Sequence, residues 1–290
     1  MTGVTSPGGA WAFDAIGTRW RIDTAAPLDD AVRGAVASVI DRFDREWSRF
    51  RGDSTVAALA QGGDVEAPAD ADAMLGAYVA LDAATGGAVN PLVGESLARR
   101  GYDAAYSFAD LGAMPAPAGW RSVLRWGDGR LCLDAPATID VGALGKGRLV
   151  DLVLAVVAPY AGGTAVVDAG GDLAVHGGAQ RIALEHPYDT SRAIGVWTVT
   201  DAALCASATN RRAWGDGLHH VLDARTGAPV RQYAATWAVA PDAMTADAVA
   251  TALFFDGGPQ LAAEWGADWV RMRTDGSVEW SPRCEAELFL

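Results

Sequence analysis

The stretch Ile-Asp-Val-Gly-Ala-Leu-Gly-Lys-Gly, residues 139–147, sets an acid, a glycine-rich turn and a lysine directly before the apolar run 148–158. Its glycines allow the backbone to approach a ligand closely. The run that follows has apolar side chains at helical spacing, which predicts a helix with one buried face. The stretch therefore predicts a helix N-terminus where backbone amides and one cation can bind phosphate. An ordinary strand-to-helix turn would explain the glycines equally well.

The P-loop of nucleotide triphosphatases does not fit this stretch. The glycine spacing before Lys146 is too short for that motif, and Gly147 stands where the motif has Ser or Thr for magnesium. The stretch alone therefore leaves the ligand open.

Composition limits the possible partners. The chain has 290 residues, half of them hydrophobic, and carries 23 Lys and Arg against 36 Asp and Glu, a net charge of −13. This charge argues against nucleic acid or an anionic membrane surface as the main partner. The three cysteines form no C-x-x-C pair, which favours buried free thiols over disulfides or zinc. The first ten residues do not read as a leader and no run is apolar enough to insert into a membrane, so we expect a cytoplasmic protein.

The patterns along the chain mix strands and helices without a regular βαβ rhythm. This predicts an α+β fold with mixed or antiparallel sheets and flanking helices, as a single domain over residues 1–290. A strand pair is expected over 11–24 with a break at Gly17, and helices are expected from 27–30 to 47–51, over 72–84 and over 148–158. Further strands are expected over 120–126, 130–133, 138–141, 164–168, 181–185, 196–200, 218–222, 269–273 and 278–280.

Two later segments carry groups capable of chemistry. Residues 219–227, His-His-Val-Leu-Asp-Ala-Arg-Thr-Gly, hold two of the four histidines of the chain. On a strand over 218–222 the two imidazoles would face opposite sides, so at most one is expected to be catalytic. The sequence Gly-Gly-Asp at 170–172 precedes this segment and is expected to form a hairpin turn.

The second segment is Met-Thr-Ala-Asp-Ala-Val-Ala-Thr, residues 244–251. On a helix, Asp247 and Thr251 are neighbours on one face, and their oxygens suit a hard cation such as magnesium. A helix capped by Thr245, with Asp247 in its first turn, would explain the same residues without a metal.

Taken together, these segments resemble the FAD:protein FMN transferases, the ApbE-like family. The similarity covers nearly the whole chain: Ala-Ile-Gly-Thr-Arg-Trp at 15–20, Ser-Arg-Phe at 48–50, Gly-Ala-Val-Asn-Pro at 87–91, and residues 140–147, 219–227 and 246–251. Ordered segments with similar spacing are more specific than any one of them alone.

The resemblance implies an enzyme that holds FAD with Mg²⁺ and moves FMN onto a Thr or Ser hydroxyl of an acceptor flavoprotein, releasing AMP. It implies magnesium ligation by the Ala143 carbonyl and by the side chains of Asp247 and Thr251. We expect His220 to be the general base, with His219 as second choice, because a neutral imidazole is available near pH 7. The FAD contacts implied by the resemblance are Ile16, Phe50, Ala88, Val89, Asn90, Asp140 and Lys146.

The chain departs from the family pattern at several positions. Ile16 replaces a usual Met, Val89-Asn90 a usual Phe-Asp, Ala208 a usual Gly and Ala224 a usual Pro. Loss of the carboxylate at 90 could change how the flavin is held, and Ala208 could restrict a turn. These departures keep a non-catalytic FAD carrier open as an alternative. A second alternative is a pyrophosphatase that cleaves FAD to FMN and AMP, as the resemblance implies for some members.

Overall fold

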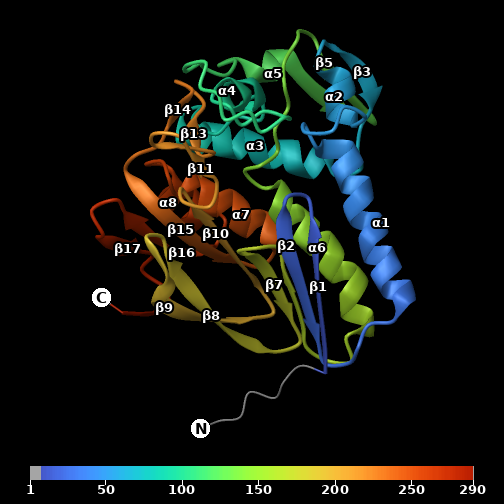
Figure 1. The fold of residues 1–290 in the computed structure, drawn as a ribbon, viewed down its shortest axis with the longest axis vertical. Coiled ribbons are helices and arrows are strands. Elements are labelled where there is room, and N and C mark those ends of the chain that lie inside the picture. Colours follow the sequence, from blue (N-terminus) through green and yellow to red (C-terminus); the bar gives the residue numbers. More distant parts are fainter. Residues whose placement is uncertain (1–7, 290) are drawn as a thin grey trace.

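The main sheet has eight strands, and every neighbouring pair in it is antiparallel. The computed structural model describes residues 8–289, and Figure 1 shows their arrangement. In spatial order the strands are β1 (Gly9–Ala15), β2 (Thr18–Thr24), β6 (Ala165–Asp168), β7 (Asp172–His176), β10 (Ala203–Ala208), β15 (Tyr233–Ala240), β16 (Asp268–Arg273) and β17 (Val278–Trp280). The expected α+β fold with antiparallel sheets and flanking helices is confirmed.

Helices cover one face of this sheet and a second, smaller sheet covers the other (Figure 1). The alternation of side chains along a strand explains the layers, since Leu173 and Val175 of β7 pack on the small sheet while Ala174 packs on the helices. The helices of that layer are α1 (Asp30–Trp47), α6 (Gly145–Val157) and α7 (Ala243–Ala252). The small sheet is β18 (Glu287–Leu288), β9 (Asp189–Thr200) and β8 (Ala179–His186).

The remaining elements lie mainly at the end of the molecule where α3 runs (Figure 1). They include the three-stranded sheet β3 (Gly63–Glu66), β5 (Arg130–Leu133) and β4 (Leu124–Gly127), and the helices α2 (Thr55–Leu59), α3 (Ala71–Thr85), α4 (Gly94–Arg99), α5 (Trp120–Val123) and α8 (Gly258–Glu264). A 3-10 turn, η1 (Ala158–Tyr160), follows α6, and two short pairs join β11 (Ala213–Trp214) to β12 (Leu218–His219) and β13 (Leu222–Asp223) to β14 (Ala228–Pro229).

Helix ends follow the residues expected to set them. Asp29 caps α1 by accepting the N–H of Val32 at 2.8 Å. Gly86 ends α3 in the left-handed conformation, with φ of 59°. The predicted helices over 72–84 and 148–158, and the hairpin that turns at Gly17, are confirmed within a few residues.

Of the predicted strands, the one over 138–141 is wrong, and those over 120–126 and 218–222 are only partly right. Residues 124–127 form β4 as expected, but residues 120–123 form a helical turn, because Trp120 and Leu124 are the buried pair and stand four residues apart. Residues 138–141 form no strand, and the Asp140 N–H instead makes a single bond to the Pro91 carbonyl at 2.8 Å. The strand expected over 218–222 is interrupted at His220, where the chain changes partner from β11 to β14.

Two further expectations concern the whole chain. Cys205 is buried, whereas Cys132 and Cys284 are partly exposed, so all three are free thiols but only one is fully buried. Residues 1–7, on which the expectation about a leader mostly falls, lie outside the described part. Between residues 8 and 289, no helix combines the length and apolar character that a membrane span requires.

The contact between α6 and α7 depends on Gly147. A Cβ atom at this position would lie 2.1 Å from the Ala243 carbonyl oxygen and 2.7 Å from the Asp247 Cβ. We expect Gly147→Ala to destabilise the protein by about 2 kcal/mol, because overpacking outweighs the roughly 1 kcal/mol gained in helix propensity.

Gly34 provides the matched control, since it is exposed on α1 and an added Cβ meets nothing within 4 Å. Gly34→Ala is expected to stabilise by about 0.5 to 1 kcal/mol in the same denaturant titration. Stabilisation by both substitutions would show that α6 and α7 can move apart without cost.

Candidate active site

Hydrogen bonds within the protein fix the bend that precedes α6, residues 140–144. The Asp140 side chain accepts the N–H of Gly142 at 2.7 Å. From α3, the buried hydroxyl of Tyr78 donates to the Asp140 carbonyl at 3.1 Å and accepts the N–H of Ala143 at 3.4 Å. Burial, together with the charge of Asp140, raises the pKa of Tyr78 well above its usual value, so the phenol stays protonated and can keep both bonds.

The first turn of α6 has fewer free amides than the sequence suggested. Three of its N–H groups already have partners within the protein, which leaves the Lys146 ammonium as the main attraction for an anion. The N–H of Gly145 donates to the Val141 carbonyl at 2.8 Å, that of Gly147 to the Asp247 carboxylate at 2.9 Å, and that of Arg148 to the Leu144 carbonyl at 3.0 Å.

Lys146 forms an ion pair with Asp172, from the Gly-Gly-Asp turn at the start of β7. The Asp172 residue is fully buried, and its Oδ1 has no hydrogen-bond partner within the described residues. Burial lowers the pKa of Lys146, but the charges of Asp172 and Asp247 outweigh it and the pKa is raised overall. The lysine is therefore a permanent cation at this point.

Asp247 comes from α7 and is 5% exposed. Burial, and then the nearby charge of Asp172, raise its pKa to about 7. Because the ionised form of this carboxylate is unfavourable in the free protein, a cation that binds beside it would stabilise that form. The bond from the Gly147 N–H fixes this carboxylate against the start of α6.

The start of α7 is capped by two acids rather than by Thr245. Asp242 accepts the N–H of Thr245 at 2.8 Å. Asp151, from α6, accepts the N–H groups of Ala243 and Met244 at 2.7 and 2.9 Å. Thr245 therefore donates its N–H to the capping residue and is not itself the cap, and Asp247 lies after the first turn of α7. The alternative explanation of this segment as a Thr245-capped helix is wrong.

The oxygen donors implied by the resemblance lie on the two segments that meet at this junction, α7 and the bend before α6. Asp247 and Thr251 stand four residues apart on α7 and so share a face. The Ala143 carbonyl lies in the bend before α6, and the first turn of α6 is bonded to Asp247 through the Gly147 N–H. Within residues 8–289, this carbonyl accepts no hydrogen bond. These donors are all oxygens.

The two histidines differ in the hydrogen bonds that their ring nitrogens make. His219 is buried, its Nε2 is 2.9 Å from the Val230 carbonyl, and its Nδ1 accepts the N–H of Val221. His220 has a buried Nδ1 without a hydrogen-bond partner among the described residues. Burial, followed by the charges of Arg212 and other nearby groups, lowers the pKa of His220 to about 3. His220 is therefore neutral and has an unused ring nitrogen.

An aromatic cluster lies beside these groups and contains Phe50, Tyr102, Tyr106, Phe108 and Trp214. Phe50 and Tyr106 are parallel, with ring centroids 5.3 Å apart. The guanidinium groups of Arg49 and Arg212 lie 5.1 and 5.9 Å from the Tyr102 ring centroid. The Arg212 carbonyl also accepts the N–H of His220 at 3.2 Å, which places this arginine between the cluster and the histidine pair.

The tip of the first hairpin approaches this cluster. Ile16 forms the turn with φ of 44°, and a Cβ on the adjacent Gly17 would lie 3.9 Å from the Tyr106 hydroxyl. Neighbouring side chains therefore connect the hairpin tip to Phe50 and, through Arg49, to Asp140, although these residues come from separate parts of the chain.

The segment 88–90 is buried, and its polar groups are engaged with the backbone. The Ala88 carbonyl accepts the N–H of Ala224 at 3.0 Å, and the Val89 N–H donates to Thr85 Oγ1 at 3.0 Å. The Asn90 amide donates to the Pro117 carbonyl at 2.9 Å and accepts the N–H of Leu92.

An aspartate at position 90 could accept but not donate, so the amide is what this chain needs there. The predicted contacts of Ala88, Val89 and Asn90 with FAD stay predictions. The concern about Ala208 does not apply, because this residue ends β10 in regular pairing with Ala235.

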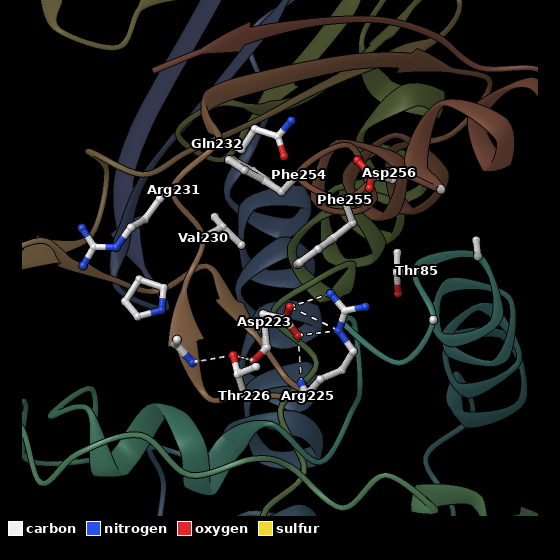
Figure 2. A pocket seen from close by; sticks show the side chains of 15 residues that line it. Thr85, Asp223, Arg225, Thr226, Val230, Arg231, Gln232, Phe254, Phe255 and Asp256 are labelled. Carbon is white, nitrogen blue, oxygen red and sulfur yellow. Dashed lines mark hydrogen bonds and ion pairs between the residues drawn. The ribbon is translucent and has the colours of Figure 1, made fainter. Parts of the chain in front are cut away.

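A cavity of about 450 Å³ opens next to this segment (Figure 2). Figure 2 shows Asp223 paired with Arg225 on one side and Phe254, Phe255 and Asp256 on another. None of the predicted site residues lines the cavity. Their charged groups are instead bound to other residues of the protein: Asp140 to Arg49, Lys146 to Asp172, and Asp247 to the Gly147 N–H.

Several contributors were missed from the sequence. Tyr78 has the spacing of an ordinary core residue of α3, so nothing marked its hydroxyl as the support of the bend. Arg49 stands next to Phe50, but its ion pair with Asp140, at 2.5 Å, joins residues 91 apart in the chain. For Asp172 the sequence predicts only a place in a turn. Its charge next to Gly-Gly was the one available signal.

Comparison with known proteins identifies the family. A model of the ApbE family matches residues 16–270. An FAD:protein FMN transferase of Treponema pallidum (strain Nichols) is 30% identical over 262 residues, which cover 76% of this chain and 69% of that protein. An FAD:protein FMN transferase of Rhodobacter capsulatus is 31% identical over 161 residues, covering 52% of this chain and only 31% of that protein.

The crystal structure of the ApbE protein of Thermotoga maritima superimposes with a TM-score of 0.82 at 23% identity, covering 94% of this chain and 96% of that one. At 23% identity, this similarity supports the fold alone. Since the family model spans most of the sequence, this chain belongs to the ApbE family.

Proposed function

We propose that this chain transfers FMN from FAD to a Thr or Ser hydroxyl of an acceptor flavoprotein and releases AMP. The observation that carries the proposal is the junction of α6 and α7, where the Gly147 N–H binds Asp247 and brings Lys146, Asp172 and Asp247 together. Both curated relatives bear the name FAD:protein FMN transferase, which supports the same activity.

The donor set fits magnesium. The side chains of Asp247 and Thr251 and the Ala143 carbonyl would hold the ion, since Mg²⁺ prefers oxygen ligands and few protein groups. The buried Asp247 carboxylate, with its raised pKa, is a group that a cation would stabilise. When bound, magnesium would offset the negative charge of the diphosphate.

The chain's own residues account for the rest of the reaction. The acceptor hydroxyl oxygen bonds to the phosphorus on the riboflavin side of FAD, the bond from that phosphorus to the AMP oxygen breaks, and AMP leaves. His220 accepts the hydroxyl proton, since its imidazole is neutral and one ring nitrogen is free. With bound magnesium offsetting the carboxylates of Asp172 and Asp247, Lys146 would supply a positive charge to the leaving phosphate. His219 suits this role less, because both of its nitrogens are engaged.

The test is a mass measurement on a candidate acceptor flavoprotein incubated with this chain, FAD and Mg²⁺. We expect a mass gain of one FMN, one AMP released per transfer, and no gain when the acceptor threonine is replaced by alanine. Rapid release of AMP without any acceptor would favour the pyrophosphatase. Tight FAD binding with no AMP under any of these conditions would favour the carrier.

A further inference from the structure

Arg49 is a buried cation with one donor unused. Its side chain is 5% exposed, its Nε donates to Asp140 Oδ2 at 2.5 Å, and its Nη2 is buried with no hydrogen-bond partner in residues 8–289. A buried guanidinium N–H without an acceptor is costly, and such groups are normally satisfied in the working protein. An acceptor for Nη2 is therefore to be expected among the ligands of this site.

The surroundings of Arg49 are aromatic rather than cationic. Its guanidinium carbon lies 4.2 Å from the Phe50 ring centroid and 5.1 Å from that of Tyr102. Tyr106, parallel to Phe50, extends this surface and is 44% exposed. A flat heteroaromatic ring suits such a surface, and an N–H at its edge suits a ring carbonyl.

The charge on Arg49 is already balanced. Asp140 pairs with it at hydrogen-bond distance, so a phosphate dianion placed at Nη2 would be repelled by that carboxylate. A neutral carbonyl would not be repelled in this way. The pair thus offers a hydrogen bond without a net charge.

Resting on the proposed function, we infer that Arg49 is a specificity residue that recognises the flavin half of FAD, its Nη2–H donating to a carbonyl oxygen of the isoalloxazine ring. Asp140 holds the guanidinium in position and does not itself need to reach the flavin. Recognition of FAD is thereby divided, with the diphosphate at the α6–α7 junction and the flavin ring at Arg49.

The experiment compares FAD with ADP-ribose, which keeps the adenosine and diphosphate but lacks the flavin, by calorimetry with Mg²⁺ present. Arg49→Gln is expected to weaken FAD binding by about 10- to 150-fold, the range for a hydrogen bond to a charged group, and to change ADP-ribose binding by less than about 3-fold. The control is Arg45→Gln, which removes an exposed arginine of α1 four residues before Arg49 and should change neither affinity.

Equal weakening of both ligands by Arg49→Gln, or no weakening of FAD, would overturn the inference. A second measurement needs no variant: the unmodified protein is titrated with FAD analogues in which the C2 or the C4 carbonyl is a thiocarbonyl, a weaker acceptor. One of the two is expected to bind about 10-fold more weakly than FAD, and equal binding of all three contradicts the proposed bond. If the unmodified protein binds no FAD at all, the proposed function fails instead.

Discussion

Replacing Asp247 by Asn is expected to lower the rate of FMN transfer by a factor of about 10³ or more, because bound magnesium supplies several kcal/mol of charge stabilisation and Asp247 is its only proposed charged ligand. The substitution keeps the size of the side chain and an oxygen that can accept the Gly147 N–H. Loss of rate would therefore not reflect loss of the α6–α7 contact. Initial rates of AMP release with acceptor present, over a range of Mg²⁺ concentrations, measure the effect.

The same substitution is expected to make the metal-free protein more stable at pH 8. Burial raises the pKa of Asp247 to about 7, above its unfolded value, so the folded state binds a proton more tightly than the unfolded chain. The stabilising contribution of the protonated form is present at low pH and is lost as the pH rises through about 7. Asn carries no charge and avoids that loss.

We expect the Tm of Asp247→Asn to exceed that of the unmodified protein at pH 8 by an amount corresponding to about 1–3 kcal/mol, and the difference to shrink towards pH 4. Asp14→Asn, which removes an exposed carboxylate on β1, serves as control and should change neither stability nor rate. A lower Tm for Asp247→Asn at pH 8 would show that the carboxylate stabilises the free protein, contrary to the burial argument.

Helices and strands could be predicted from the sequence where a local pattern determines them. The prediction failed where contacts with distant parts of the chain determine the structure. Asp29 and Gly86 set helix ends through bonds to residues a few positions away, so both ends could be read from the sequence. The strand expected over 218–222 has a strand-like pattern, but its partners lie on two different hairpins, and no local pattern shows where the chain changes from one to the other.

The site shows the same division. The pairing of Asp247 with Thr251 follows from helical spacing, whereas Lys146 with Asp172 and Arg49 with Asp140 join segments 26 and 91 residues apart. Charge and spacing identify such side chains as candidates. Only the packing of α6 on β7, and of α1 beside the bend, determines which acid meets which base.

Replacing His220 by Ala is expected to slow FMN transfer by a factor of about 10² to 10⁴, the usual contribution of a general base, while the Kd for FAD changes by less than about threefold. Burial and the charge of Arg212 lower the pKa of His220 to about 3, so the ring is unprotonated throughout the range from pH 5 to 8. Single-turnover rates with saturating FAD isolate the chemical step.

His219→Ala provides the contrasting variant. It would leave the Val230 carbonyl and the Val221 N–H without their ring partner, so we expect a lower Tm, by an amount corresponding to about 1–3 kcal/mol, with the single-turnover rate of the folded protein retained. The opposite pattern, in which His219→Ala removes the rate and His220→Ala leaves it intact, would exchange the two roles. In that case the hydrogen bonds of His219 would orient a catalytic ring rather than merely anchor β12 to Val230.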